Sequence, residues 1–115
     1  MPSGGRIINI GSIFSKMGTR DTAIYDAAKA AQDRLNASWA GELGVSGGIT
    51  VNTVAPGPVM TDMARTGLKT PKGTPTQLQL SLFSRTRAAL CLGTVEDVGD
   101  AVLLLVPEKS RWITA

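Results

Sequence analysis

Apolar runs and one long helical pattern alternate in the first half of the chain. The run Arg6–Ile10 (RIINI) is rich in isoleucine and bounded by glycines, which predicts a buried strand. From about Asp21 to Leu43 apolar residues recur at steps of three and four, which predicts a helix that GVSGG ends. The β-branched run Ile49–Ala55 (ITVNTVA) predicts a second strand, stopped by PGP. The recurring apolar residues of the helix are Ala28, Ala31, Leu35, Trp39 and Leu43.

The order strand, helix, strand predicts a parallel pair joined by a right-handed crossover. Asp21 or Thr22 is the expected helix cap. Residues 58–76 are polar and irregular, which predicts a functional loop or a flexible segment. QLQLSLFSR then predicts a short helix, and TVEDVGDAVLLLV a longer one capped by Thr94. Because these elements cannot cover both faces of a parallel sheet, we expect part of a larger α/β domain.

The composition excludes several kinds of catalytic and metal site. The chain has 115 residues, 43% of them hydrophobic, which fits one small globular domain. Histidine is absent, which excludes Ser-His-Asp and Cys-His catalysis and histidine metal sites, and the single Cys91 excludes an intrachain disulfide. We expect no metal and no membrane span, and the lone cysteine and the unremarkable start of the chain favour a cytoplasmic protein.

Tyr25 and Lys29 are the strongest chemical candidates, because positions four apart lie on one helical face. A free tyrosine has a pKa of about 10, and a cation within about 4–6 Å typically lowers it by 1–3 units. That shift would suit general acid-base catalysis. The alternative is ordinary packing, since an amphipathic helix can place an aromatic ring and a lysine stem in the same way.

Ser12 and the Pro56-Gly57 turn follow the two predicted strands, where ligands sit in open parallel sheets. The serine could donate a hydrogen bond to a substrate oxygen. Gly57 admits dihedrals closed to other residues, so the backbone could pass close to a flat ligand. The alternatives are a hydroxyl that satisfies local backbone and a plain strand stop.

The segments INIGS, YDAAK and VNTVAPGPVMTDM, in this order and spacing, resemble the short-chain dehydrogenase/reductase family. The resemblance runs from about Gly5 to Thr114 and implies a partial Rossmann-type, doubly wound parallel sheet. It further implies an NAD(P)-dependent oxidoreductase that interconverts a ketone and a secondary alcohol. Residues 1–115 would be the catalytic half of that domain, cut off at both ends, and the whole enzyme a homo-oligomer.

The resemblance also implies a role for each matching residue. Ser12 would polarise the substrate carbonyl, Tyr25 would act as acid or base, and Lys29 would lower the pKa of Tyr25 and bind the nicotinamide ribose. Residues 58–76 would form a substrate lid. The residues that frame the nicotinamide or bond to its carboxamide would be Pro56, Gly57, Val59 and Thr61.

Several family features have no counterpart here, among them the glycine-rich turn and the residue that selects NAD or NADP. The cofactor is therefore NAD or NADP, with NADP the favoured form, and the truncated chain alone is expected to be inactive.

A second hypothesis is a non-catalytic fragment or pseudoenzyme that associates through its helices. Nucleic-acid binding is disfavoured, because no row of stacking aromatics accompanies the basic residues Arg65, Lys69, Lys72, Arg85 and Arg87.

Overall fold

The computed structural model describes residues 3–18, 20–67, 74, 76–84, 86 and 91–115. These residues divide into two compact units. The first comprises Met1–Pro56 with Asp100–Ala115, and the second comprises Gly57–Gly99. The strands and the long helix belong to the first unit.

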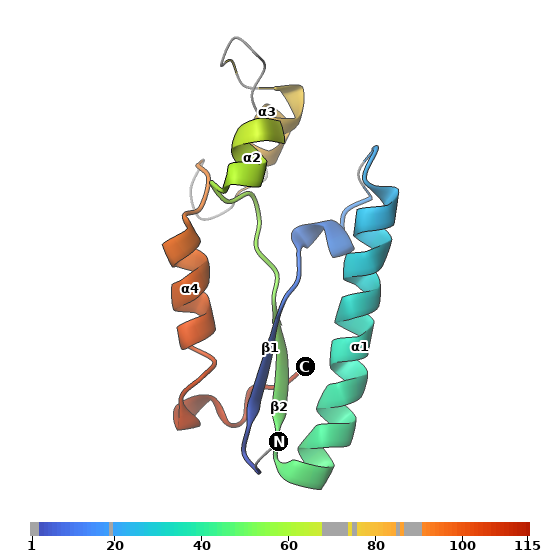
Figure 1. Cartoon of the computed structure of the whole chain (residues 1–115), viewed down its shortest axis with the longest axis vertical. Helices are drawn as coiled ribbons and strands as arrows, with labels where there is room; N and C mark the ends of the chain where they lie inside the picture. Colours follow the sequence, from blue (N-terminus) through green and yellow to red (C-terminus); the bar gives the residue numbers. More distant parts are fainter. Residues whose placement is uncertain (1–2, 19, 68–73, 75, 85, 87–90) are drawn as a thin grey trace. The chain divides into compact units, whose positions relative to one another are not determined.

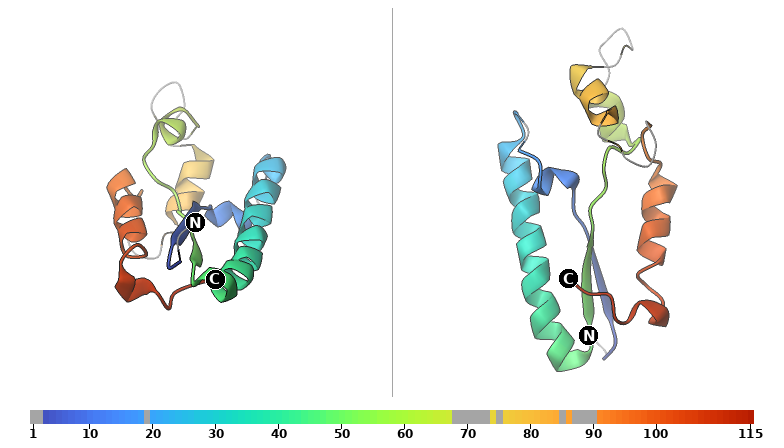
Figure 2. Two further views of the ribbon diagram at one scale, coloured as in Figure 1. Left: turned by 60° about the horizontal axis from the view of Figure 1, so that its bottom comes forward. Right: turned by 180° about the vertical axis from the view of Figure 1, so that it is seen from behind.

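The first unit is built on two parallel strands and one long helix. Strand β1 spans Arg6–Ile10, helix α1 spans Ala23–Gly47, and strand β2 spans Thr50–Val54. The strands pair in parallel, with Arg6 opposite Thr50 and each following residue in step. Helix α1 runs alongside the strands in both ribbon views (Figures 1 and 2). Both predicted strands and their parallel pairing are confirmed. The expected burial of β1 is not, because its residues are half-buried and Ile10 is 46% exposed.

The predicted end of α1 was four residues too early. Gly44 and Gly47 remain helical, and the helix stops at Gly48, which has a left-handed φ of 62°. The Gly48 N–H donates to the Gly44 carbonyl at 2.9 Å, and the Ile49 N–H donates to the Leu43 carbonyl at 3.3 Å. Glycine inside a helix costs only about 1 kcal/mol, so the first glycine of a run need not end it. At the other end Thr22 is the N-cap residue, but its side chain makes no capping hydrogen bond.

Of its recurring apolar residues, helix α1 packs only Leu43 against the core. It buries Asn36 (1% exposed) and Ala40, whereas Leu35 and Trp39 remain 46% and 37% exposed. Ala40 forms the core with Ile49 and Val51, and Ile7 and Leu43 pack against them. The apolar periodicity therefore located the helix correctly but marked the side that packs on the strands only at Leu43.

Asn36 links α1 to both strands. Its Oδ1 accepts a hydrogen bond from Asn9 Nδ2 at 2.6 Å, and its Nδ2 donates to the Val51 carbonyl at 3.3 Å. A buried amide needs such partners at both ends, because an unpaired polar group is costly away from water. Asn36 thereby fixes the position of the helix on the strands.

The last residues of the chain end beside β2, as Figure 2 shows. They follow the 3-10 turn η2, Glu108–Ser110. The Asn52 side chain donates to the Ile113 carbonyl at 2.8 Å, and the Ala115 N–H donates to the Val51 carbonyl at 3.1 Å. The Val51 N–H donates to Thr114 Oγ1 at 3.1 Å. The chain end therefore occupies the free edge of β2.

The second unit contains short helices. Helix α3, Gln77–Phe83, is confirmed, whereas helix α2, Asp62–Gly67, was not predicted and lies inside the segment expected to be irregular. Residues 68–73 and 75 of that expected lid lie outside the described residues. So do Lys69, Lys72, Arg85 and Arg87 of the basic set, whereas Arg65 lies 3.9 Å from the Asp62 carboxylate.

Helix α4, Val95–Leu103, begins in the second unit and ends in the first. The Asp97 N–H donates to Thr94 Oγ1 at 3.1 Å, and the Thr94 N–H donates to Asp97 Oδ2 at 2.7 Å, so the predicted cap is confirmed. The backbone and side-chain hydrogen bonds of Thr94 lower the pKa of Asp97 below its ordinary value. Within the described part of the chain, no helix is both long and apolar enough to cross a bilayer.

Candidate active site

Ser12 lies directly after β1 and caps the 3-10 turn η1, Ile13–Ser15. It is 6% exposed, and its Oγ accepts the Phe14 N–H at 3.2 Å. The oxygen is the acceptor in this bond, so the hydroxyl proton is not used in it. The sequence thus places a serine hydroxyl at the carboxyl end of a parallel strand, held in a defined orientation by its own turn.

Tyr25 lies in the first turn of α1, on the same face as Lys29. Lys29 Nζ is 5.8 Å from the centroid of the Tyr25 ring, within the range of a cation–π interaction. The ammonium also donates to the Ile10 carbonyl at 2.9 Å and to Gln32 Oε1 at 3.2 Å. Since an ammonium has three N–H donors, these two bonds leave one for another partner.

A continuous series of contacts joins Ser12, Tyr25 and Lys29. The Phe14 N–H bonds to Ser12, and the Phe14 ring meets the Tyr25 ring edge-on, with centroids 6.0 Å apart. Lys29 lies beside Tyr25 and bonds to Ile10, two residues before Ser12. Tyr25 itself is 45% exposed. The three predicted residues therefore gather at the carboxyl end of β1.

The four residues expected to frame a nicotinamide divide between the units. The Pro56 carbonyl accepts the Ile13 N–H at 3.2 Å, which holds the loop after β2 against the turn after β1. Val59 forms a bridge with Gly93 in the second unit, and Thr61 Oγ1 accepts the Ala64 N–H at 3.2 Å. The Thr61 side chain thus bonds to the backbone of the first turn of α2 in this structure.

Gly57 does not use the dihedral freedom expected of it. Among the described glycines, positive φ angles occur at Gly4 and Gly48. An added Cβ at Gly57 would meet no atom within 4 Å. The space where a side chain of Gly57 would lie is therefore open, and a flat group could approach there. The backbone of Gly57 is nevertheless not left-handed.

The sequence analysis did not identify Asp33 and Gly11 as residues of the candidate site. Asp33 Oδ2 accepts a hydrogen bond from Ser15 Oγ at 2.6 Å, so the helix holds the turn that begins at Ser12. A Cβ on Gly11 would lie 2.5 Å from the Thr53 side chain and 3.3 Å from Asp33 Oδ1. The one available signal was the position of Asp33, four residues after Lys29 on the same helical face.

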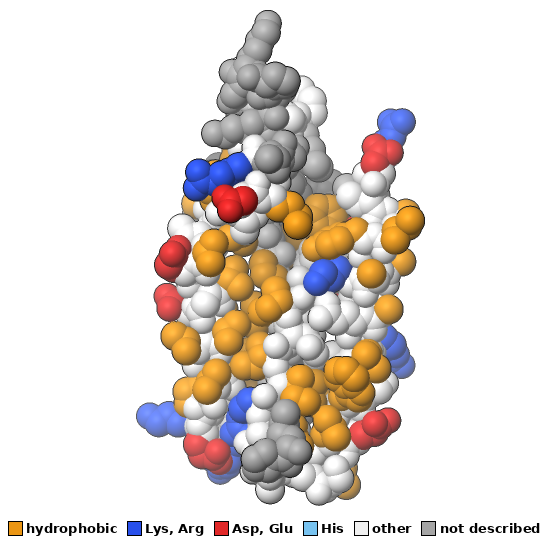
Figure 3. Space-filling view, in the orientation of Figure 1, with side chains coloured by type: hydrophobic (Ala, Val, Ile, Leu, Met, Phe, Trp, Pro, Cys, Tyr) orange, Lys and Arg blue, Asp and Glu red, His pale blue; other side chains and the backbone are white. Residues whose placement is uncertain are grey.

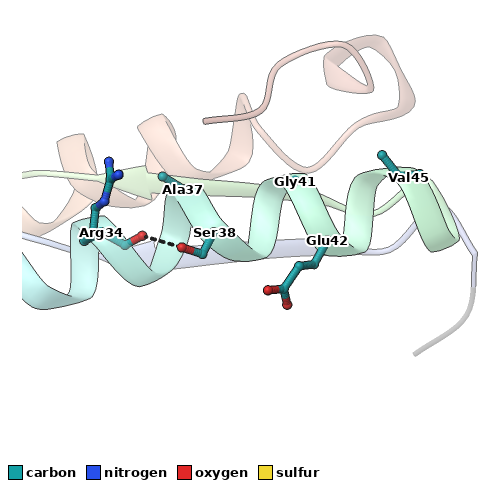
Figure 4. A pocket seen from close by; sticks show the side chains of 6 residues that line it. All are labelled: Arg34, Ala37, Ser38, Gly41, Glu42 and Val45. Carbon is teal, nitrogen blue, oxygen red and sulfur yellow. Dashed lines mark hydrogen bonds between the residues drawn. The ribbon is translucent and has the colours of Figure 1, made fainter.

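A shallow hollow lies on a different part of α1. Half of its lining residues are small, and Ser38 Oγ donates to the Arg34 carbonyl at 3.3 Å (Figure 4). None of Ser12, Tyr25 and Lys29 contributes to it. The lining residues are Arg34, Ala37, Ser38, Gly41, Glu42 and Val45.

Comparison with known proteins now defines the class. The profile of the family described as enoyl-(acyl carrier protein) reductase matches residues 1–115. The short-chain dehydrogenase/reductase FrzI of Cladobotryum sp is 38% identical over 109 residues, covering 95% of this chain and 42% of FrzI. The 3-oxoacyl-[acyl-carrier-protein] reductase FabG of Vibrio cholerae is 39% identical over 110 residues, covering 96% of this chain and 41% of FabG.

A solved structure agrees with these sequence matches. The angucycline C-6 ketoreductase LanV with bound NADP superposes with a TM-score of 0.80 at 29% identity, over 99% of this chain and 41% of LanV. The protein belongs to the short-chain dehydrogenase/reductase family, and its parallel strands and helices form part of a Rossmann-type fold. The chain spans about two fifths of the length of these relatives.

Proposed function

We propose that this chain supplies the proton-transfer machinery of an NAD(P)-dependent oxidoreductase that interconverts a ketone and a secondary alcohol. The observation that carries the proposal is the contact series from Ser12 through Phe14 and Tyr25 to Lys29 at the end of β1. Family membership supports the reaction class, and the similarity to LanV, a ketoreductase, supports a carbonyl substrate.

The three residues would have different roles. The Ser12 hydroxyl proton would bond to the substrate carbonyl oxygen and favour negative charge there. The Tyr25 hydroxyl would give its proton to that oxygen in reduction and take it back in oxidation. Lys29 would hold the Tyr25 ring in place, because its ammonium lies 5.8 Å from the ring centroid.

The first unit fits the ribose next to the nicotinamide of the cofactor, which would supply the hydride. Lys29 retains one N–H donor that would bond to a ribose hydroxyl. The sequence contains no glycine-rich turn for the pyrophosphate. The proposed cofactor is NAD or NADP, and the NADP bound to LanV favours the latter.

A hybrid enzyme tests the proposal. Residues 5–114 would replace the matching segment of Vibrio cholerae FabG, and oxidation of the reduced cofactor with a 3-oxoacyl substrate would be followed by absorbance. We expect an active hybrid that loses at least about 100-fold in turnover on Ser12→Ala, since one positioned donor contributes about that much. Ser38→Ala, on the outer side of α1, is the matched control and should be silent. A folded hybrid that is inactive, or indifferent to Ser12→Ala, would refute the proposal.

A second candidate function is association through α1, and its specific support is the exposed apolar surface of this helix. Ile24 is 89% exposed and Val45 is 94% exposed, and apolar side chains lie open along α1 in Figure 3. Small residues in the hollow would let another helix approach closely. A homo-oligomer built on this face predicts that Gly41→Arg lowers the sedimentation coefficient of the chain. An unchanged coefficient, from a chain that already sediments as a monomer, would exclude it.

A further inference from the structure

Asp33 joins helix α1 to the turn that carries Ser12. Its Oδ2 accepts the Ser15 hydroxyl at 2.6 Å and lies 3.3 Å from Lys16 Nζ. Ser15 is the last residue of η1, and Lys16 is its C-cap. The side chain of Asp33 is 17% exposed, whereas that of Lys16 is 76% exposed, so water weakens the ion pair more than the bond to Ser15. The far end of the turn is thus held by a charge-assisted hydrogen bond and an ion pair.

The same carboxylate also borders the near end of the turn. Asp33 Oδ1 lies 3.3 Å from the position that a Cβ of Gly11 would take, directly before Ser12. This oxygen is buried and has no hydrogen-bond partner among the described residues. One side chain therefore flanks the Ser12 turn, residues 12–16, at both of its ends.

The position of Asp33 on α1 relates its bond with Ser15 to Tyr25 and Lys29. Tyr25, Lys29 and Asp33 follow one another at steps of four, so they form one row along a rigid helix. The first two carry the proposed proton chemistry, and Lys29 also bonds to Ile10 at the end of β1. The row therefore holds the β1 end at Ile10 and the Ser12 turn at Ser15.

We propose that Asp33 is a positioning residue that fixes the Ser12 hydroxyl relative to Tyr25 by holding the Ser12 turn on α1. Its importance for catalysis rests on the proposed function, in which Ser12 polarises the substrate carbonyl. The positional claim concerns the turn alone and can be measured without turnover.

The Phe14 amide is a direct reporter, because its N–H donates to Ser12 Oγ. In the 115-residue chain, the Ser12→Ala variant defines the Phe14 amide resonance when that acceptor is absent. Asp33→Ala is expected to move the Phe14 resonance most of the way toward this reference. Asp33→Asn should move it much less, since an amide oxygen still accepts from Ser15 although the ion pair with Lys16 is lost.

Two controls separate positioning from general destabilisation. The Val51 amide, in the core strand, should stay in place in all Asp33 variants. Glu42→Gln removes one negative charge from the exposed side of α1 and should leave Phe14 unmoved. A Phe14 resonance that stays in place in Asp33→Ala, or that does not respond to Ser12→Ala, would overturn the proposal. A shift of Phe14 and Val51 together would also overturn it, because the effect would then be global.

The two proposals fail separately. If Phe14 shifts as expected but Ser12→Ala leaves the hybrid reductase fully active, the turn is held by Asp33 and the proposed function is wrong. If Ser12→Ala disables the hybrid while Asp33→Ala leaves Phe14 in place, the function stands and the positioning role is wrong.

Discussion

Replacing Tyr25 with phenylalanine removes one oxygen atom and keeps the ring. The ring contacts are to Phe14, with centroids 6.0 Å apart, and to the Lys29 ammonium at 5.8 Å. Both survive in Tyr25→Phe. Because the position is 45% exposed, we expect the free energy of unfolding to change by less than about 0.5 kcal/mol.

Turnover should respond very differently. A positioned proton donor contributes about 10²–10⁴-fold, which corresponds to about 2.7–5.4 kcal/mol in the activation free energy. In the hybrid reductase, Tyr25→Phe is therefore expected to lower kcat by that factor while the affinity for the reduced cofactor is retained. Steady-state kinetics give kcat, and fluorescence titration of the cofactor gives the affinity.

Lys29 variants complete the comparison. Lys29→Ala should lower both kcat and cofactor affinity, because one ammonium would serve the phenol and the ribose. Lys29→Arg should not restore full activity, since a planar guanidinium cannot replace a compact ammonium between Ile10 and the ring. Arg34→Ala removes a cation from the exposed side of the same helix and should have no effect. A Tyr25→Phe hybrid with near-normal kcat would show that the tyrosine is only part of the helix packing.

Three further predictions concern the 115-residue chain itself. It should bind NADPH weakly or not at all by calorimetry, because it contains no glycine-rich turn for the pyrophosphate, and tight saturable binding would contradict this. Asn36→Ala leaves the Asn9 amide and the Val51 carbonyl without their partner and should cost about 2–4 kcal/mol in urea unfolding, with Ser38→Ala as the exposed control. The lowered pKa of Asp97 implies a stabilising contribution that is present above about pH 4, the ordinary aspartate range, and lost as the pH falls through the lower folded-state value. The protection factor of the amides at the start of α4, which is the ratio of intrinsic to observed exchange rate, should therefore fall on acidification in the wild type, and this fall should vanish in Asp97→Asn.

The sequence predicted those elements whose cause is local. An isoleucine-rich run between glycines and a β-branched run before PGP predicted both strands nearly to the residue, because short β-branched runs flanked by glycine or proline favour a strand over a helix. The reciprocal cap of Thr94 and Asp97 was foreseeable for the same reason, since its partners are three residues apart.

Features that depend on partners distant in the chain could not be predicted from the sequence. Asn36 packs on the strands because Asn9 and Val51 offer it partners 27 and 15 residues away, and a polar residue gives no apolar signal. Likewise the sequence does not distinguish Asp33 from a surface acid, because its partners Ser15 and Lys16 are distant in the chain. Helix α2 is six residues long, too short for periodicity to reveal.

The location of the missed residues explains why a short motif can work only in this setting. The spacing of Tyr25 and Lys29 follows from helix geometry alone, so it would be the same in any helix. The relation of this pair to Ser12 is a tertiary property, and two groups on α1 create it: the Lys29 ammonium at Ile10 and the Asp33 carboxylate at Ser15. Asn36, one helical turn after Gln32, then fixes the helix on the strands. The proposed chemistry therefore depends on residues that the motif does not contain, and a chain that kept Ser12, Tyr25 and Lys29 but lost Asp33 and Asn36 would hold the three groups in place less firmly.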